Sequence, residues 1–257
     1  MMVLGIDIGA SAAKGIILDD KQKVVSSHVR SSGVNFEEAA EQTRAICLRS
    51  AGIAESDVRF TVATGYGRRN VAFADETRTE ISCHAKGGYF HHPGACTIVD
   101  IGGQDSKVIR VDDTGRPFRF KMNRKCAAGT GAFLEEIAAR MAVPLDELDT
   151  LARNAQKEIE LGSFCTVFTK TEILARIAEG AQAEDIAKGI FSSVIKRIME
   201  MDPLSGHIVI TGGVIAHNPY LGEMFEQKLN KRPFIPPLPQ FAGALGAALY
   251  SLEKSGG

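Results

Sequence analysis

The sequence predicts an α/β protein built from two related halves. Three observations lead to this fold class. Apolar segments of strand length alternate with helical patterns, one strand-turn-strand segment occurs twice, and a glycine-rich turn follows each of three strands. The chain has 257 residues, of which 44% are hydrophobic, so it can fill a core in each half.

The elements of the first half follow from local patterns. Residues 3–18 form an apolar run broken by polar and glycine positions, which predicts a strand, a glycine turn and a second strand. Asn35 and Glu38 have the spacing of a capping box, and they predict a helix over residues 36–50. Another strand is expected at residues 58–63.

The second half begins with strands and then becomes rich in helices. Strands are expected at residues 96–101, 107–111 and 207–210, and helices at residues 131–141, 145–155, 173–178 and 185–199. Thr169 and Glu172 have capping-box spacing, so we expect Thr169 to precede the helix at residues 173–178. A helix of small residues at 241–252 could close the first half.

An internal repeat relates the two halves. A shift of 93 positions lays residues 7–20 on residues 100–113, and seven of the fourteen positions are identical. The identities include the Asp-Ile-Gly turn and a lysine, Lys14 on Lys107. Because the matches fall at turn and polar positions, we interpret them as two copies of one hairpin.

Composition excludes several classes of function. Thirty basic and 31 acidic residues leave a net charge of −1, so we expect no nucleic-acid partner and no attraction to an anionic membrane. The first residues lack the basic region of a signal peptide, and no apolar run is long enough to cross a bilayer. We therefore expect a cytoplasmic protein.

Three glycine-rich turns are candidates for phosphate binding. They lie at residues 7–11, 100–104 and 211–214, each directly after a predicted strand. Glycine lets backbone N–H groups approach phosphate oxygens, and Asp7 and Asp100 could hold Mg²⁺, mostly through waters. A single turn of this kind is usually an ordinary tight hairpin. Three of them, two being repeats, favour a nucleotide clamp.

Two other phosphate-binding motifs are excluded. The Walker pattern is absent from the chain, and the G-x-G segments at residues 65–67 and 129–131 lack the third glycine of the dinucleotide fingerprint. The clamp is therefore neither a P-loop nor a Rossmann turn.

The three turns resemble the two phosphate motifs and the adenosine motif of the actin/Hsp70/sugar-kinase superfamily. More narrowly, the chain resembles the ATP-dependent activators of 2-hydroxyacyl-CoA dehydratases and the ATPase subunits of benzoyl-CoA reductase, which form the BadF/BadG/BcrA/BcrD ATPase family. The stretches that carry this resemblance are residues 63–68, 80–85, 123–131, 165–168 and 240–248. The complete Gly-Gly-Gln-Asp turn at residues 102–105 favours an activator over a reductase subunit.

The resemblance implies duplicated actin-like, ribonuclease H-like subdomains with ATP in the cleft between them. Residues 1–95 with 236–257 would form the first subdomain, and residues 96–235 the second, which carries the cluster cysteines. Gln104 would orient the attacking water, while Asp7 and Asp100 would lie near Mg²⁺. The implied nucleotide-binding residues are Gly9, Ala10, Ser11, Ala12, Ala13, Lys14, Gly102, Gly103, Gln104, Gly212, Gly213, Gln240 and Gly243.

One departure from the family pattern lies in the first turn. Ala10 and Ala12 stand where hydroxyl residues are common in the family. Two side-chain hydrogen bonds to phosphate are therefore lost, while Ser11, Lys14 and the backbone amides remain.

Two of the five cysteines are candidate cluster ligands. Cys126 and Cys165 each stand four residues before a threonine that we expect to cap a helix, Thr130 and Thr169. The positive end of a helix dipole favours a thiolate. The family resemblance implies that these two cysteines, one pair from each subunit of a homodimer, bind one 4Fe-4S cluster.

The other three cysteines predict no cluster chemistry. Cys47 lies in an amphipathic helix and Cys96 begins a buried strand, so both indicate packing. Cys83 belongs to a family motif, but its role there is not that of a ligand. His84, His91 and His92 lack the ligand spacing of a metal site.

The resemblance implies an ATP-dependent one-electron donor from anaerobic metabolism. It would receive an electron from ferredoxin or flavodoxin and use ATP hydrolysis to drive the electron onto a 2-hydroxyacyl-CoA dehydratase. Three alternatives stay open: an ATPase subunit of a benzoyl-CoA reductase-type enzyme, a small-molecule kinase of the same fold, and a non-catalytic actin-like scaffold.

Overall fold

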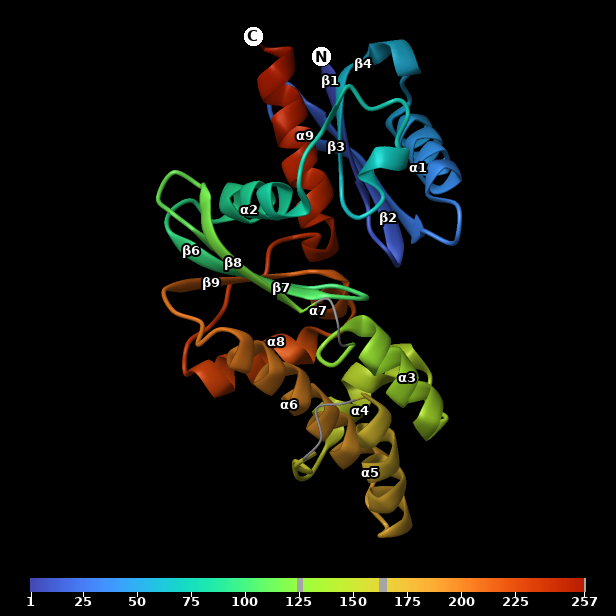
Figure 1. The fold of residues 1–257 in the computed structure, drawn as a ribbon, viewed down its shortest axis with the longest axis vertical. Coiled ribbons are helices and arrows are strands. Elements are labelled where there is room, and N and C mark those ends of the chain that lie inside the picture. The colour runs from blue at the N-terminus through green and yellow to red at the C-terminus, as the bar shows by residue number, and fades with distance from the viewer. Residues whose placement is uncertain (124–126, 162–165, 257) are drawn as a thin grey trace. The chain divides into compact units, whose positions relative to one another are not determined.

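The structure is a computed structural model that describes residues 1–123, 127–161 and 166–256 (Figure 1). Its contacts divide the chain into two compact units. The first unit comprises Met1–Cys96, Arg110–Arg119 and Phe241–Gly257, and the second comprises Thr97–Ile109 and Phe120–Gln240. Within the described residues, no helix is both long enough and apolar enough to span a membrane.

The first unit contains a mixed sheet. Its strands are β1 (Met2–Ile8), β2 (Ala12–Asp19), β3 (Val24–Ser31), β4 (Val58–Thr64) and β5 (Glu76–Thr77), in the order β3-β2-β1-β4-β5. β1 pairs antiparallel with β2 and parallel with β4, so β1 is a central strand. Its interior is apolar and buried, as expected for a strand covered on both faces.

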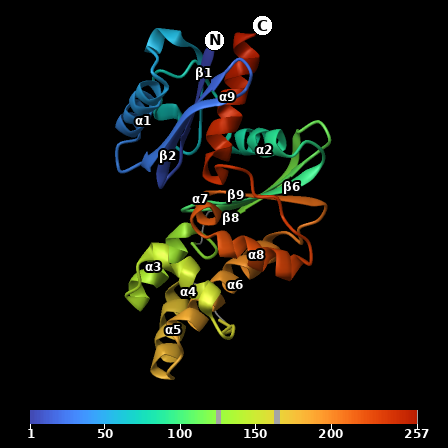
Figure 2. The ribbon, with the colours of Figure 1, turned by 180° about the vertical axis from the view of Figure 1, so that it is seen from behind.

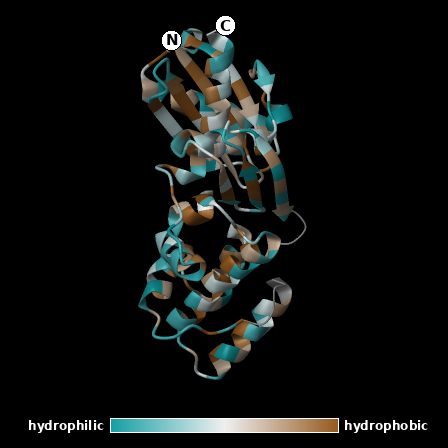
Figure 3. Ribbon diagram, turned by 90° about the vertical axis from the view of Figure 1, so that its left-hand side faces the viewer, coloured by the Kyte–Doolittle hydropathy of each residue, from teal (hydrophilic) through white to brown (hydrophobic). Residues whose placement is uncertain are grey.

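Helices cover both faces of this sheet (Figures 1 and 2). Alternation along β1 places Leu4 and Ile6 in one core with α1 (Phe36–Ala51), and Val3 in another core with α9 (Ala242–Ser255). Figure 3 shows hydrophobic residues concentrated along these strands. This packing on both faces fixes the ends of β1 and β2, and thereby the turn that joins them.

A third helix of the first unit, α2 (Glu80–His91), packs closely on α9. A Cβ at Gly246 would collide with the Cys83 carbonyl, and one at Gly87 would collide with the Ala242 carbonyl. The two helix backbones therefore touch at two places, which fixes their mutual register.

The second unit contains a related sheet. Its strands are β6 (Cys96–Ile101), β7 (Ser106–Val111), β8 (Pro117–Asn123) and β9 (His207–Thr211), in the order β8-β7-β6-β9. The order repeats that of the first sheet, with β9 in the place of β4. The repeat seen in the sequence thus extends over three consecutive strands in each half.

Helices of the second unit bury a large apolar core. They are α3 (Gly131–Met141), α4 (Leu148–Asn154), α5 (Thr166–Ala178), α6 (Ala183–Met201), α7 (Gly213–His217) and α8 (Pro219–Leu229). Phe133 from α3, Phe191 from α6 and Phe225 from α8 are fully buried in this core together with strand residues such as Val99. α6 packs against α4 and α8, and these helices share one core with the strands of the sheet.

Most predicted elements are confirmed. Asn35 caps α1 by accepting a hydrogen bond from the Glu38 amide at 3.1 Å, and Gly52 ends that helix in the left-handed conformation. The predicted C-terminal helix is α9, and it closes the first unit as expected.

One helix boundary was predicted wrongly. α5 begins at Thr166, so Thr169 lies within the helix and does not cap it. Thr169 is fully buried. The capping-box spacing therefore arose inside a helix, where it has no capping role. Thr130 does occupy the N-cap position of α3, but its hydroxyl donates to the Ala127 carbonyl at 2.6 Å instead of capping the helix.

Candidate nucleotide-binding site

The β1–β2 turn presents a carboxylate and an ammonium group together. Asp7 is the penultimate residue of β1, and the antiparallel register pairs it with Lys14 on β2. Lys14 Nζ lies 3.6 Å from Asp7 Oδ2, and the Asp7 side chain is only 5% exposed. The turn therefore holds a nearly buried negative charge beside a partly exposed positive one.

The tip of this turn leaves backbone amides for an anion. The Gly9 amide donates to the Ala12 carbonyl at 3.0 Å, and the Ser32 hydroxyl donates to the Gly9 carbonyl at 2.6 Å. Both bonds brace the turn from within. Ala10 and Ser11 lie exposed at its tip, where their amides can face a phosphate oxygen.

The remaining predicted residues of the first unit have different surroundings. Ala12 is half-buried, whereas Ala13 is fully buried in the core on the α1 side and pairs with Ile8 in the ladder. Gly243 lies at the start of α9, where a Cβ would be 2.8 Å from Asp7 Oδ2. The structure thus brings Gly243 next to the Asp7 carboxylate although 235 residues separate them in the chain.

The second turn repeats the charge pair of the first. Asp100 is the penultimate residue of β6 and is 3% exposed. Lys107 Nζ lies 3.4 Å from Asp100 Oδ2 and 2.6 Å from Asp105 Oδ1. The Thr211 hydroxyl donates to Asp100 Oδ1 at 2.9 Å. Both oxygens of the Asp100 carboxylate therefore have fixed partners.

Glycine is required in the third turn. Gly212 has a φ of 106°, and a Cβ there would collide with the backbone of Ile101. The Gly212 amide donates to the Pro239 carbonyl at 3.0 Å, which ties this turn to the segment that carries Gln240. Gly213 begins α7, and a Cβ added to it would meet no atom within 4 Å. β9 and its turn are thereby held against β6.

Backbone hydrogen bonds join the second turn to α3. The amides of Gly131 and Ala132 donate to the carbonyls of Gly102 and Gly103 at 2.9 and 2.8 Å. The buried Ser106 hydroxyl also donates to the Gly129 carbonyl at 2.7 Å. The first amides of a helix need partners outside it, and here the turn supplies them. Gln104, at the tip of the turn, is exposed.

The two predicted cluster ligands, Cys126 and Cys165, lie outside the described residues. The other three cysteines are buried, and burial raises the pKa of Cys47 and Cys83 to about 12 and that of Cys96 to about 11. They stay protonated thiols at neutral pH. The packing roles predicted for Cys47 and Cys96 are confirmed. Among the residues described, no group of three or more metal-ligating side chains occurs.

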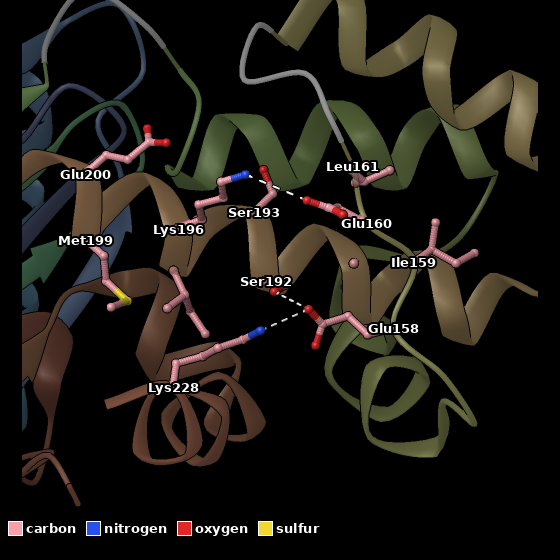
Figure 4. Close-up of a pocket in the computed structure, with 12 residues that line it drawn as sticks. Glu158, Ile159, Glu160, Leu161, Ser192, Ser193, Lys196, Met199, Glu200 and Lys228 are labelled. Carbon is pink, nitrogen blue, oxygen red and sulfur yellow. Dashed lines mark hydrogen bonds and ion pairs between the residues drawn. The ribbon is translucent and has the colours of Figure 1, made fainter. Parts of the chain in front are cut away.

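A pocket of about 730 Å³ lies elsewhere in the second unit (Figure 4). Glu158 accepts from Ser192 at 2.6 Å and from Lys228 at 3.1 Å, and Lys196 lies 3.9 Å from Glu160. Its charged groups thus pair with one another across the pocket. None of the residues predicted to bind nucleotide lines it.

A comparison with protein families decides the identification. Residues 4–251 match the sequence pattern of the BadF/BadG/BcrA/BcrD ATPase family, and this range includes every turn described above. The chain belongs to this family. The predicted α/β fold of duplicated actin-like ATPase subdomains is also confirmed, because the structure matches solved proteins of that fold over its whole length.

Individual family members are similar over nearly their full length. The activator of lactoyl-CoA dehydratase from Anaerotignum propionicum is 41% identical over 99% of both chains. Two solved structures also match. The activator of the 2-hydroxyisocaproyl-CoA dehydratase from Clostridium difficile, with bound ADPNP, is 39% identical with a TM-score of 0.92, covering 100% of this chain and 96% of that one. Component A of the (R)-2-hydroxyglutaryl-CoA dehydratase from Acidaminococcus fermentans is 37% identical with a TM-score of 0.95, covering 100% of both chains.

Sequence reasoning assigned no site role to three residues of these turns. Lys107 could have been found from the repeat, which aligns it with Lys14. Thr211 and Asp105 belong to motifs that were identified, but no local pattern shows that both surround the Asp100–Lys107 pair. Their roles depend on the pairing of β6 with β9 and on the conformation of the turn.

Proposed function

We propose that this protein is an ATP-hydrolysing activator that delivers single electrons to a 2-hydroxyacyl-CoA dehydratase. The observation that carries the proposal is the repeated Asp–Lys turn in a chain about 40% identical, over nearly its full length, to dehydratase activators. Three relatives are named as activators of three different 2-hydroxyacyl-CoA dehydratases.

The residues of both turns fit a Mg²⁺-nucleotide. Each turn offers a nearly buried carboxylate with an ammonium group within 4 Å, and glycine keeps the approach to it open. Lys14 and the amides of Ala10 and Ser11 would bind phosphate oxygens, and Asp7 and Asp100 would hold Mg²⁺ through its waters. When bound, the metal would neutralise charge that develops on the phosphates. Gln104 would orient the attacking water from its exposed position.

A route from nucleotide to cluster is supported by the hydrogen bonds of the second turn. The same turn that would contact the γ-phosphate holds the first amides of α3 and, through Ser106, the carbonyl of Gly129. Cys126 precedes this segment in the chain. A change in the turn on hydrolysis would therefore reach the residues next to Cys126, since these groups are linked directly.

Cys126 and Cys165 would supply the thiolate ligands of a 4Fe-4S cluster. α5 begins at Thr166, so Cys165 directly precedes a helix N-terminus, where the positive dipole end favours a thiolate. Two ligands per chain require a second subunit for a complete ligand set, which makes the protein a homodimer. The cluster supplies reversible one-electron chemistry when bound.

Electrons and atoms balance in this scheme. A reduced ferredoxin or flavodoxin gives one electron to the protein, and the protein passes that electron to the dehydratase. ATP and water yield ADP and phosphate, and their free energy favours the conformation from which transfer occurs. The relatives support a dehydratase as the acceptor over the reductase of a benzoyl-CoA type enzyme. A kinase role would leave both cysteine motifs without a function.

The test is an anaerobic activation assay. The protein, reduced and mixed with ATP, Mg²⁺ and an inactive 2-hydroxyacyl-CoA dehydratase, should restore dehydration. ADP in place of ATP should restore none. A protein that hydrolyses ATP but activates no dehydratase, while phosphorylating a small-molecule substrate, would replace this proposal with the kinase alternative.

A further inference from the structure

A buried histidine lies beside the first turn. His84 is the fifth residue of α2 and is 7% exposed, on the helix face that packs against α9. Asp7, on the neighbouring β1 strand, is 4% exposed. Little water reaches either group, so a hydrogen bond between them would be only weakly screened.

The packing of α2 on α9 determines where His84 lies. The contacts of Gly246 with Cys83 and of Gly87 with Ala242 bracket His84 on one helix and Gly243 on the other. These are backbone contacts, so rotamer changes cannot relieve them. His84 is therefore held opposite Gly243.

The missing side chain of Gly243 leaves a small space that Asp7 and His84 share. A Cβ on Gly243 would lie 2.8 Å from Asp7 Oδ2 and 3.1 Å from His84 Nε2. The two atoms border the same point and are within reach of one bridging water. Asp7 Oδ2 is also the oxygen that Lys14 approaches at 3.6 Å.

We propose that His84 is a positioning residue of the nucleotide site, whose Nε2 fixes the orientation of the Asp7 carboxylate through a hydrogen bond, direct or through one water. The inference rests on the proposed function only in taking Asp7 as the group that orients Mg²⁺-bound water. Lys14 holds the same oxygen from the open side of the turn, and His84 holds it from the α2 side. Gly243 is required because any larger residue would fill the space between them.

The experiment compares three variants by calorimetry. His84→Leu removes both ring nitrogens, His84→Gln keeps an amide at the reach of Nε2, and His91→Leu is the matched control on the same helix. Mg²⁺ is titrated into the protein saturated with ADP, and ADP binding is also measured in EDTA. For His84→Leu we expect the apparent Kd for Mg²⁺ to rise roughly tenfold or more, with ADP binding in EDTA unchanged.

The conservative variant separates positioning from packing. His84→Gln should keep Mg²⁺ affinity within a few-fold of the wild type, and His91→Leu should match the wild type. If His84→Gln is damaged as severely as His84→Leu, or if His84→Leu binds Mg²⁺ normally, the proposal is wrong. Should His84→Leu fail to fold, His84→Met, which also carries no nitrogen but has a more flexible side chain, takes its place in the same titration.

Failure of this inference can be told apart from failure of the proposed function. A wild type that binds Mg²⁺-ADP with the expected variant pattern, but activates no dehydratase, overturns only the activator role. Normal dehydratase activation together with unaltered Mg²⁺ binding in His84→Leu overturns only the role of His84. A wild type that binds no nucleotide overturns both.

Discussion

At the scale of single residues, the two halves repeat a buried Asp beside a Lys. Asp7–Lys14 and Asp100–Lys107 are each seven residues apart in their hairpins, and the N–O distances of the two pairs are 3.6 and 3.4 Å. The repeat in the sequence predicts both pairs. It cannot predict His84, because its nearness to Asp7 depends on α2 packing against α9, which is more than 150 residues further along the chain.

Gln104 should affect hydrolysis and not binding. Its side chain is exposed at the tip of the second turn, and Gln104→Ala removes no contact that holds the turn together. We expect kcat for ATP hydrolysis to fall roughly 10²-fold with KM within a few-fold of the wild type. Steady-state phosphate release measures both. Gln42→Ala, an exposed glutamine on α1, is the control, and unchanged kcat in Gln104→Ala would remove this residue from the mechanism.

At the scale of elements, patterns predicted buried strands better than exposed ones. β1 and β6 are mostly apolar and buried along their length, and their sequences identify them. β3 and β8 are edge strands with serine, arginine and lysine among partly exposed positions, so they were not predicted from the sequence. The helix that follows Cys165 was predicted, but its start was placed too late, because Thr169 imitated a cap.

Ser106 should couple hydrolysis to electron delivery. Its buried hydroxyl joins the second turn to the Gly129 carbonyl, just before α3. Ser106→Ala should keep ATP turnover within a few-fold but lower ATP-dependent activation of the dehydratase about fivefold or more, since the link to the Cys126 segment is weakened. The activation assay and phosphate release, run on the same sample, give the ratio.

The matched control for this variant lies in the same unit. Ser192 donates its hydroxyl to Glu158 at the pocket, away from the turns, and Ser192→Ala should leave the ratio unchanged. Equal loss of turnover and activation in Ser106→Ala would mean that Ser106 stabilises the turn without coupling it to the cluster.

At the scale of the whole molecule, the sequence predicted the duplicated fold because one hairpin recurs with seven of fourteen positions identical. Both sheets share their strand order, and each ends its first strand in an Asp-Ile-Gly turn. The domain boundaries at residues 1–95 with 236–257 and at 96–235 stay a prediction, which limited proteolysis with and without nucleotide can test. The cluster also stays a prediction, since its ligands lie outside the described residues.

The most direct test of the account is the iron content and absorbance of the anaerobically purified protein, measured together with its native mass. We expect a brown dimer with about four iron atoms per two chains. The Cys126→Ser/Cys165→Ser variant should be colourless and dimerise weakly, because the shared cluster contributes to association. Cys47→Ala and Cys96→Ala should keep colour and dimer. A brown, dimeric double variant would show that the ligands are wrongly assigned, and a colourless wild type without iron would contradict the electron-transfer role itself.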